Sequence, residues 1–141
     1  MIRDHFRVLT VNLSSGRGNV LTLDGRETYV GGSGLAALLF DKFGQPDRPW
    51  NAPEQPLIFA IGPLTTIFPV VTKTAATFRS PLTGEYGESH AGGQFSSSLR
   101  YAGYDHLMIK GAAKSPVYLW IQNGKIEIHD VDGNLLRKFS Y

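Results

Sequence analysis

The chain has no cysteine among its 141 residues. Disulfides, thiolate metal sites, cysteine-ligated iron–sulfur clusters and cysteine nucleophiles are therefore excluded from what this chain does by itself. The sequence also has no run of apolar residues long enough to span a membrane, and the charged residues after Met1 lead us to expect no signal peptide. Disulfides form mainly in oxidising compartments, so a chain without cysteine favours a reducing one. Together with the lack of an apolar span, this leads us to expect a cytoplasmic protein that does not bind a membrane.

Charge is sparse as well. Charged residues make up 18% of the chain and the net charge is only +2. No concentrated basic tract accompanies the pI near 9.0, so we do not expect nucleic acid as a partner. Apolar residues make up 42% of the sequence, which favours a folded core over disorder. The length predicts a single domain over residues 1–141.

Short apolar segments separated by turn residues predict mostly β structure. Two segments that follow glycine pairs predict short helices, over residues 35–43 and 96–102. Asn123-Gly124 is typical of a tight β-hairpin. We therefore expect an α+β fold of mostly antiparallel sheet with two short helices. The predicted strands are 6–13, 20–23, 57–61, 70–78, 106–110, 116–122 and 125–129; residues 28–30 are predicted to be extended and residues 80–93 irregular.

A faint repeat relates the two halves of the sequence. One glycine pair, at 31–32, precedes the first predicted helix, and another, at 92–93, precedes the second. Each helix ends at a glycine, Gly44 or Gly103, and is followed by a predicted strand. The pattern suggests an internal duplication of a β-rich unit with one helix. Chance similarity between glycine-rich segments explains it equally well.

The first glycine turn, from Gly32 to Ala37, matches the dinucleotide fingerprint G-x-G-x-x-A. The preceding strand is short, however, and no ribose-binding acid stands about twenty residues further on. Tight packing of the helix is the commoner reason for such glycines. A nicotinamide or flavin site is therefore the weaker interpretation.

The second glycine turn combines Ser89, His90, Gly92 and Gly93 before the second predicted helix. Lys73 lies on the predicted strand that leads toward this loop. A lysine, an imidazole and open backbone N–H groups together suit a phosphate or pyrophosphate. The alternative is an ordinary turn whose polar side chains are solvated.

Other polar residues form no recognisable catalytic or metal site. Glu85 and Glu88 are close in sequence, but exposed loop carboxylates are usually solvated. The serine run at 96–98 lacks the G-x-S-x-G pattern of a nucleophile elbow. The histidines do not have the spacing of zinc ligands, so we assign no metal ligand and no catalytic residue. They are His5, His90, His106 and His129, the last two expected at strand ends.

Six segments carry a family resemblance: RVLTVNL (7–13), YVGGSGLAA (29–37), LIFAIGP (57–63), RSPLTG (79–84), LRYAGYD (99–105) and PVY (116–118). In this order and spacing they resemble the N-terminal domain of the aldehyde:ferredoxin oxidoreductases. The likeness runs from about Phe6 to the last predicted hairpin.

The resemblance implies a cofactor. Members of this family hold a tungsten ion, less often molybdenum, between the dithiolenes of two pterins, with a [4Fe–4S] cluster beside it. The metal centre oxidises aldehydes to carboxylates, and electrons leave through the cluster to ferredoxin. The N-terminal domain provides a base of two β-sheets for the pterins, and downstream domains supply the cluster cysteines.

Three positions of the family's cofactor site match residues of this chain. Lys73 stands where the family commonly has an arginine between pterin and cluster, which keeps the charge and loses the bidentate fork. His90 stands where an asparagine commonly binds a magnesium ion that joins the pterin phosphates. Because magnesium prefers oxygen ligands, a hydrogen bond from His90 to phosphate is the milder expectation. Gly92 matches a position whose backbone meets the phosphates.

The resemblance also implies partners. The chain would be a cofactor-binding domain or small subunit, inactive alone, that works with a large cysteine-bearing subunit or with C-terminal domains and reaches ferredoxin only through them. An exposed apolar face, and with it a partner or homo-oligomer, is expected. The alternative is an orphan domain that serves protein–protein interaction, and the residues at positions 73 and 90 favour it.

Overall fold

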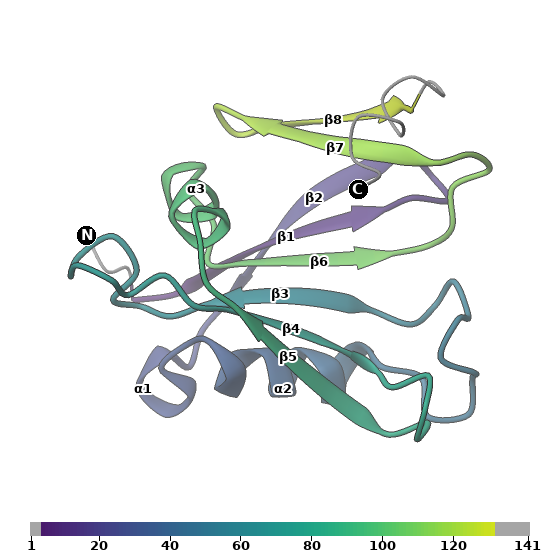
Figure 1. Cartoon of the computed structure of the whole chain (residues 1–141), viewed down its shortest axis with the longest axis horizontal. Helices are drawn as coiled ribbons and strands as arrows, with labels where there is room; N and C mark the ends of the chain where they lie inside the picture. Colours follow the sequence, from purple (N-terminus) through teal and green to yellow (C-terminus); the bar gives the residue numbers. More distant parts are fainter. Residues whose placement is uncertain (1–3, 132–141) are drawn as a thin grey trace.

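The structure is a computed structural model that describes residues 4–131. Within this range a six-stranded sheet, a two-stranded hairpin and three helices form the fold (Figure 1). The elements are β1 (Phe6–Asn12), β2 (Arg17–Leu23), α1 (Arg26–Tyr29), α2 (Ser33–Phe43), β3 (Leu57–Ile61), β4 (Thr74–Arg79), β5 (Tyr86–Ala91), α3 (Phe95–Tyr101), β6 (His106–Lys110), β7 (Val117–Gln122) and β8 (Lys125–Asp130).

The strand order of the large sheet is β2-β1-β6-β3-β4-β5. Each neighbouring pair in this sheet is antiparallel except β1 and β6, which run parallel. The separate β7–β8 hairpin turns at Asn123 and Gly124, both of which have positive φ. This left-handed backbone is what a tight hairpin turn requires. The α+β class with mostly antiparallel sheets is therefore confirmed.

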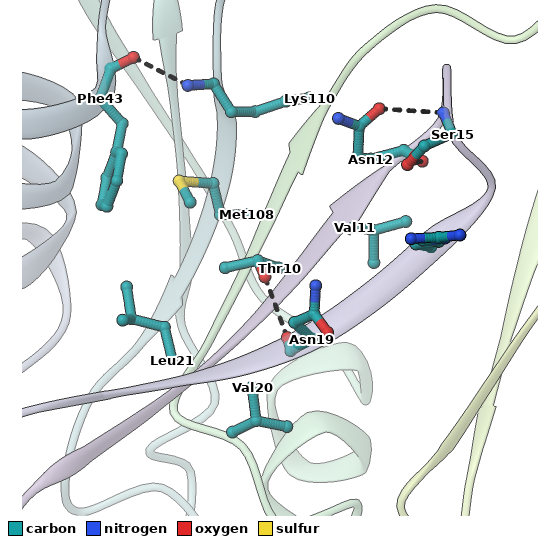
Figure 2. Close-up of a pocket in the computed structure, with 11 residues that line it drawn as sticks. Thr10, Val11, Asn12, Ser15, Asn19, Val20, Leu21, Phe43, Met108 and Lys110 are labelled. Atoms are coloured by element: carbon teal, nitrogen blue, oxygen red, sulfur yellow. Dashed lines mark hydrogen bonds between the residues drawn. The ribbon is translucent and has the colours of Figure 1, made fainter.

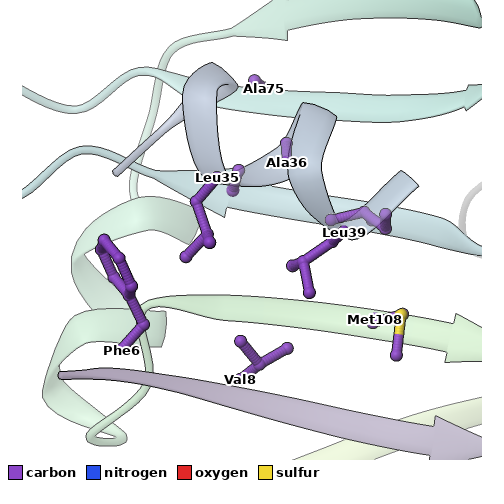
Figure 3. Packing of buried hydrophobic residues seen from close by; sticks show 9 residues of the cluster. Phe6, Val8, Leu35, Ala36, Leu39, Ala75 and Met108 are labelled. Atoms are coloured by element: carbon purple, nitrogen blue, oxygen red, sulfur yellow. The ribbon is translucent and has the colours of Figure 1, made fainter. Parts of the chain in front are cut away.

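One face of the sheet is covered by α2 (Figure 1). Leu35 and Leu39 lie one turn apart on the helix and pack against Val8 and Met108 of the sheet (Figure 3). Ile58 of β3 belongs to the same buried cluster. Both leucines are fully buried, and burial of each such side chain contributes about 2 kcal/mol. The apolar stripe of α2 thus fixes the helix across the strands β1, β6, β3 and β4.

The opposite face is covered by α3 and by the β7–β8 hairpin (Figure 1). Leu99 of α3 and Tyr104 pack on Leu9 and Leu107, and apolar side chains of the hairpin complete this second core. The hairpin residues in it are Leu119, Ile121, Ile126 and Ile128. Because both faces are covered, the central strands are apolar on both sides.

A buried carboxylate, Asp105, connects the start of β6 to three other elements. It accepts hydrogen bonds from the Arg7 backbone N–H (2.9 Å) and pairs with the guanidinium groups of Arg26 (3.2 Å) and Arg100. Burial alone raises the pKa of Asp105, but the Arg7 N–H and the two arginine charges outweigh it and hold the pKa below its usual value. The carboxylate is therefore charged and fully paired.

The structure differs from the sequence-based prediction in several segments; β2, for example, begins at Arg17, three residues earlier than predicted. Residues 86–91, expected to be irregular, form the edge strand β5, which pairs with β4 along its whole length. Thr28 and Tyr29, expected to be extended, lie instead in the single turn of α1, which Val30 follows, so the helices within residues 4–131 number three. Strand β4 begins at Thr74, four residues later than predicted. No helix within residues 4–131 has the length and apolar character of a membrane span.

The strand order also bears on the sequence repeat. The sheet order β2-β1-β6-β3-β4-β5 has two similar halves. In one half the β1–β2 hairpin lies beside β6, which follows α3, and in the other the β4–β5 hairpin lies beside β3, which follows α2. The directions differ, because β1 is parallel to β6 whereas β4 is antiparallel to β3. The duplication stays a prediction. The ends of the proposed 1–141 domain lie outside the described residues.

Candidate functional site

Lys73 and His90 line the same small cavity, whose volume is ≈ 200 Å³. The cavity lies at the N-terminal end of α2, where Gly32 and Ser33 form part of its wall. Gly62, which follows β3, lies on another side. The structure thus brings together residues from both glycine turns and the lysine.

Strand pairing explains this arrangement. His90 of β5 is opposite Ala75 of β4, and Lys73 directly precedes β4. The end of β3 is level with the start of β4, because Ile61 is opposite Thr74. The Gly32 N–H donates to the Ile61 carbonyl at 3.0 Å, which holds the start of α2 against the end of β3. Three strand ends and one helix start therefore meet at the cavity.

Glu88 joins the site, although its sequence context predicts a solvated carboxylate. Its carboxylate accepts hydrogen bonds from Ser33 and, at 2.7 Å, from the Tyr86 hydroxyl, and it lies 2.6 Å from Nε2 of His90. The bonds from Ser33 and Tyr86 lower the pKa of Glu88, and this effect outweighs its burial. Recognition of β5 would have revealed the residue, because Tyr86, Glu88 and His90 alternate along one strand face.

Ser89 and the second glycine pair lie apart from this cavity. Ser89 is on the strand face opposite to His90, because side chains alternate along β5. Gly92 and Gly93 follow the strand and are exposed. A Cβ at either glycine would meet no atom within 4 Å, so their backbone is open to a ligand. The Ser89 hydroxyl and the His90 imidazole therefore do not lie on one side of β5, as a common site would require. The open backbone expected at the second glycine pair is present.

Two side chains behind the cavity hold its glycine turns. Arg100 donates to the Gly62 carbonyl at 2.8 Å, and Nε2 of His106 lies 3.3 Å from the Gly32 carbonyl. His106 is the first residue of β6, at a strand end as the sequence predicts, and its side chain is fully buried. Burial lowers the pKa of His106 to about 4, so the imidazole is neutral at physiological pH.

The remaining candidates show no metal or nucleophile arrangement. Among residues 4–131, no group of three or more His, Asp and Glu side chains could hold a metal ion. Ser96 is buried and donates to the Thr72 carbonyl at 2.9 Å, which is a packing role. Glu85 is exposed, as the sequence predicts.

The fold defines an α+β sheet domain with a cavity at one end of the sheet that Lys73 and His90 line. Comparison with known proteins identifies the family. The model described as "Aldehyde ferredoxin oxidoreductase, N-terminal domain" matches residues 8–138. The chain therefore belongs to the aldehyde ferredoxin oxidoreductase family and corresponds to its N-terminal domain.

Similar proteins support this assignment. The tungsten-containing aldehyde ferredoxin oxidoreductase of Pyrococcus furiosus is 39% identical over 127 residues, which are 88% of this chain and 21% of that protein. The enzyme of the same name from Thermococcus kodakarensis is 36% identical over 128 residues, with the same shares of each chain. This chain thus spans 21% of the length of these curated relatives.

A solved structure shares the fold. It is the active site complex BamBC of benzoyl coenzyme A reductase with 1,5-dienoyl-CoA, with a TM-score of 0.85 and 34% sequence identity. The match covers 89% of this chain and 20% of that chain.

Proposed function

We propose that this chain is the cofactor-binding part of a tungsten or molybdenum bis-pterin oxidoreductase. The observation on which the proposal rests is the shared cavity of Lys73 and His90 beside the first turn of α2. A lysine ammonium, an imidazole and the N–H groups of a helix start all favour an anion. The anion we expect is the phosphate end of a pterin cofactor.

The residues fit a phosphate group and not a whole pterin. The cavity of ≈ 200 Å³ is smaller than the sites that enclose a complete organic ligand. The open backbone at Gly92 and Gly93 offers further N–H donors outside it. Ser89, on the other face of β5, would contact the cofactor only from that side. The rest of the cofactor would therefore lie on other surfaces.

The magnesium ion that the resemblance implies between pterin phosphates belongs to this proposal as well. Neither His90 nor the glycines offer the side-chain oxygen that magnesium prefers. Glu88 has such oxygens, but they already accept hydrogen bonds from Ser33 and Tyr86. We therefore expect a magnesium ion, if bound, to take its ligands mainly from phosphates and water.

Oxidation itself needs groups from elsewhere. When bound, the metal–pterin group would supply the two-electron oxidation of an aldehyde, and a [4Fe–4S] cluster would pass the electrons toward ferredoxin. The cluster requires cysteines, and this chain has none. We therefore propose a large cysteine-bearing subunit or C-terminal domains as the partner and expect no oxidation by this chain alone. Its contribution is electrostatic and positional.

Pyrophosphate binding tests the proposal. We expect inorganic pyrophosphate to shift the amide NMR signals of Gly92 and Gly93 and the ring signals of His90. Lys73→Gln should weaken this binding about tenfold, because a charge-assisted contact is lost. Lys114→Gln, at an exposed loop position, is the matched control and should bind as the natural chain does. Equal affinity of the Lys73 and Lys114 variants would contradict the proposal.

The rival function is an interaction module without a cofactor, and the exposed apolar side chains favour it. Val70, Leu82 and Trp120 are 95%, 92% and 53% exposed. Co-purification from a host supplied with tungsten and molybdenum distinguishes the two functions, with mass spectrometry to detect pterin and metal. Recovery of a partner together with pterin supports the proposal, and recovery of a partner without pterin supports the rival.

A further inference from the structure

A larger cavity, of ≈ 480 Å³, lies on the α2 face of the sheet beyond Phe43, where the helix ends. Figure 2 shows its floor on β1, β2 and β6 and its wall at Phe43. This cavity and Lys73 lie at opposite ends of the sheet. Lys110, at the end of β6, lies near Leu57 at the start of β3, whereas Lys73 lies near Ile61 at the end of β3. The two cavities are therefore separate.

Strand register arranges the polar residues of this cavity in two rows. Asn12 of β1 is opposite both Arg17 of β2 and Lys110 of β6, so these three side chains share one sheet face. In the next row, Thr10 lies between Asn19 and Met108. Helix α2 covers the apolar rows of this face and stops before these polar ones.

The cavity has an excess of hydrogen-bond donors. The Arg17 guanidinium and the Asn19 amide make no side-chain hydrogen bond or ion pair to any residue in the range 4–131. Asn12 uses its Oδ1 to accept from the Ser14 and Ser15 N–H groups, so its NH₂ is available. Lys110 donates to the Phe43 carbonyl at 3.1 Å and keeps its other donors.

The charge of the cavity is one-sided. Arg17 and Lys110 line it, and no Asp or Glu does. Burial lowers the pKa of Lys110, and Glu54, which lies outside the lining, opposes this effect. A partly desolvated ammonium attracts an anion more strongly than a fully hydrated one, because the local dielectric constant is lower. The same cavity also has apolar walls, formed by Val20, Leu21, Phe43 and Met108.

We propose that this cavity binds a small organic acid, with its carboxylate on the Arg17–Asn12–Lys110 row and its apolar body against Phe43 and Met108. Its volume lies in the range of sites for small organic ligands. Guanidinium and ammonium donors match a carboxylate, and the two positive charges, with no Asp or Glu in the lining, disfavour a cationic ligand. This inference does not depend on the proposed phosphate site at Lys73 and His90.

Titration with 2-naphthoate tests the inference on the 141-residue chain. We expect shifts in the amide NMR signals of Asn12, Asn19 and Lys110 that saturate with added ligand. The neutral isostere 2-naphthamide should bind at least about tenfold more weakly, because it lacks the charge that pairs with the two cations. Equal affinity of acid and amide, or saturable shifts confined to other parts of the chain, would overturn the inference.

Two variants test whether the Arg17–Asn12–Lys110 row is the binding site. Arg17→Gln and Lys110→Met should each weaken 2-naphthoate binding about five- to tenfold. Arg17 is exposed, so its variant keeps the fold even where the Lys110 variant is less stable. Lys125→Gln on β8 is the matched control and should leave the affinity unchanged. Unchanged binding by the Arg17 variant with intact amide spectra would remove the cavity as the site.

Discussion

At the scale of single residues, one buried carboxylate joins elements that are far apart in sequence. Asp105 pairs with Arg26 and Arg100, whose side chains are only 12% and 16% exposed, and its own side chain is 2% exposed. Arg100 in turn holds the Gly62 carbonyl at the cavity of Lys73. The stability of the fold and the shape of the candidate site therefore depend on the same charge.

Asp105→Asn should destabilise the chain by about 3–5 kcal/mol, because it leaves two partly buried guanidinium groups without a counter-charge. Urea unfolding at neutral pH measures this loss. Asp41→Asn, at an exposed position of α2, should change the free energy of unfolding by less than about 0.5 kcal/mol. A similar small change for both variants would show that the arginines find other partners.

The buried imidazole of His106 predicts a pH dependence. The unfolded chain binds a proton at this histidine near its ordinary pKa of 6.5, whereas the folded chain does so only at a pKa of about 4. The contribution of the neutral His106 to the free energy of unfolding is therefore fully present above pH 6.5 and is lost as the pH drops from 6.5 toward 4. The loss from His106 at pH 5 should be about 2 kcal/mol.

His106→Gln should remove most of this dependence, even though the variant is less stable at pH 7. The measurement compares the free energy of unfolding at pH 7 and pH 5 in both proteins. Asp105 and Glu88, whose pKa values are also lowered, contribute mainly below their ordinary values of 3.8 and 4.5, outside this window. An equal drop in both proteins would assign the effect to other groups.

At the scale of the elements, the turn after β6 is more tightly packed than the hairpin turn at Gly124. Gly111 has φ +84, and a Cβ there would lie 2.6 Å from both the Asn12 Oδ1 and the Ser14 N. Gly124 has a similar φ of +74, but no atom lies within 4 Å of its Cβ position. The two glycines share a backbone conformation and differ in the space around them.

Gly111→Ala should therefore destabilise the chain by about 3 kcal/mol or more, and Gly124→Ala by about 1 kcal/mol, since only the first adds a clash to the backbone strain. Urea unfolding of the two variants compares them directly. If the losses were equal, the β1–β2 turn would be free to move away from Gly111.

Elements with a strong local pattern are predictable from the sequence, and those held by their neighbours are not. Helix α2 has apolar residues at helical spacing, and the β7–β8 hairpin has the Asn123-Gly124 signal. Strand β5 has no apolar alternation, because it is an edge strand whose side chains are mostly exposed. Its pairing with β4 is a tertiary effect that no local pattern contains.

The cavities show the same division. The sequence suggests that Lys73 and the turn after His90 belong to one site, but it does not contain the reason. Strand β4 runs away from Lys73, and the return strand β5 brings His90 beside it. The role of Glu88 is not predictable, since it depends on recognising β5 and on the position of α2. The Arg17–Asn12–Lys110 row needs the register of β1 with β6, which are distant in sequence. Cofactor binding at Lys73 and His90 stays a prediction.

At the scale of the whole molecule, apolar side chains remain uncovered on the described surface. Tyr101, the last residue of α3, is 80% exposed. Phe95 and Trp120 are 46% and 53% exposed around an apolar groove between α3 and the hairpin. Surfaces of this kind usually mark contacts with other proteins. They agree with a chain that spans 21% of the length of its relatives, and they favour the proposed partner or homo-oligomer.

The parallel pairing of β1 with β6 governs how this domain is made. The Arg7 N–H bonds to a carboxylate that is 98 residues further along the chain. A ribosome that adds roughly 5–20 residues per second needs about 5–20 s to synthesise that interval. Until then the β1–β2 hairpin has an open, apolar edge, which is prone to pair with other chains. Newly made protein should therefore depend on chaperones during synthesis. Expression at a lower growth temperature should raise the yield of folded protein.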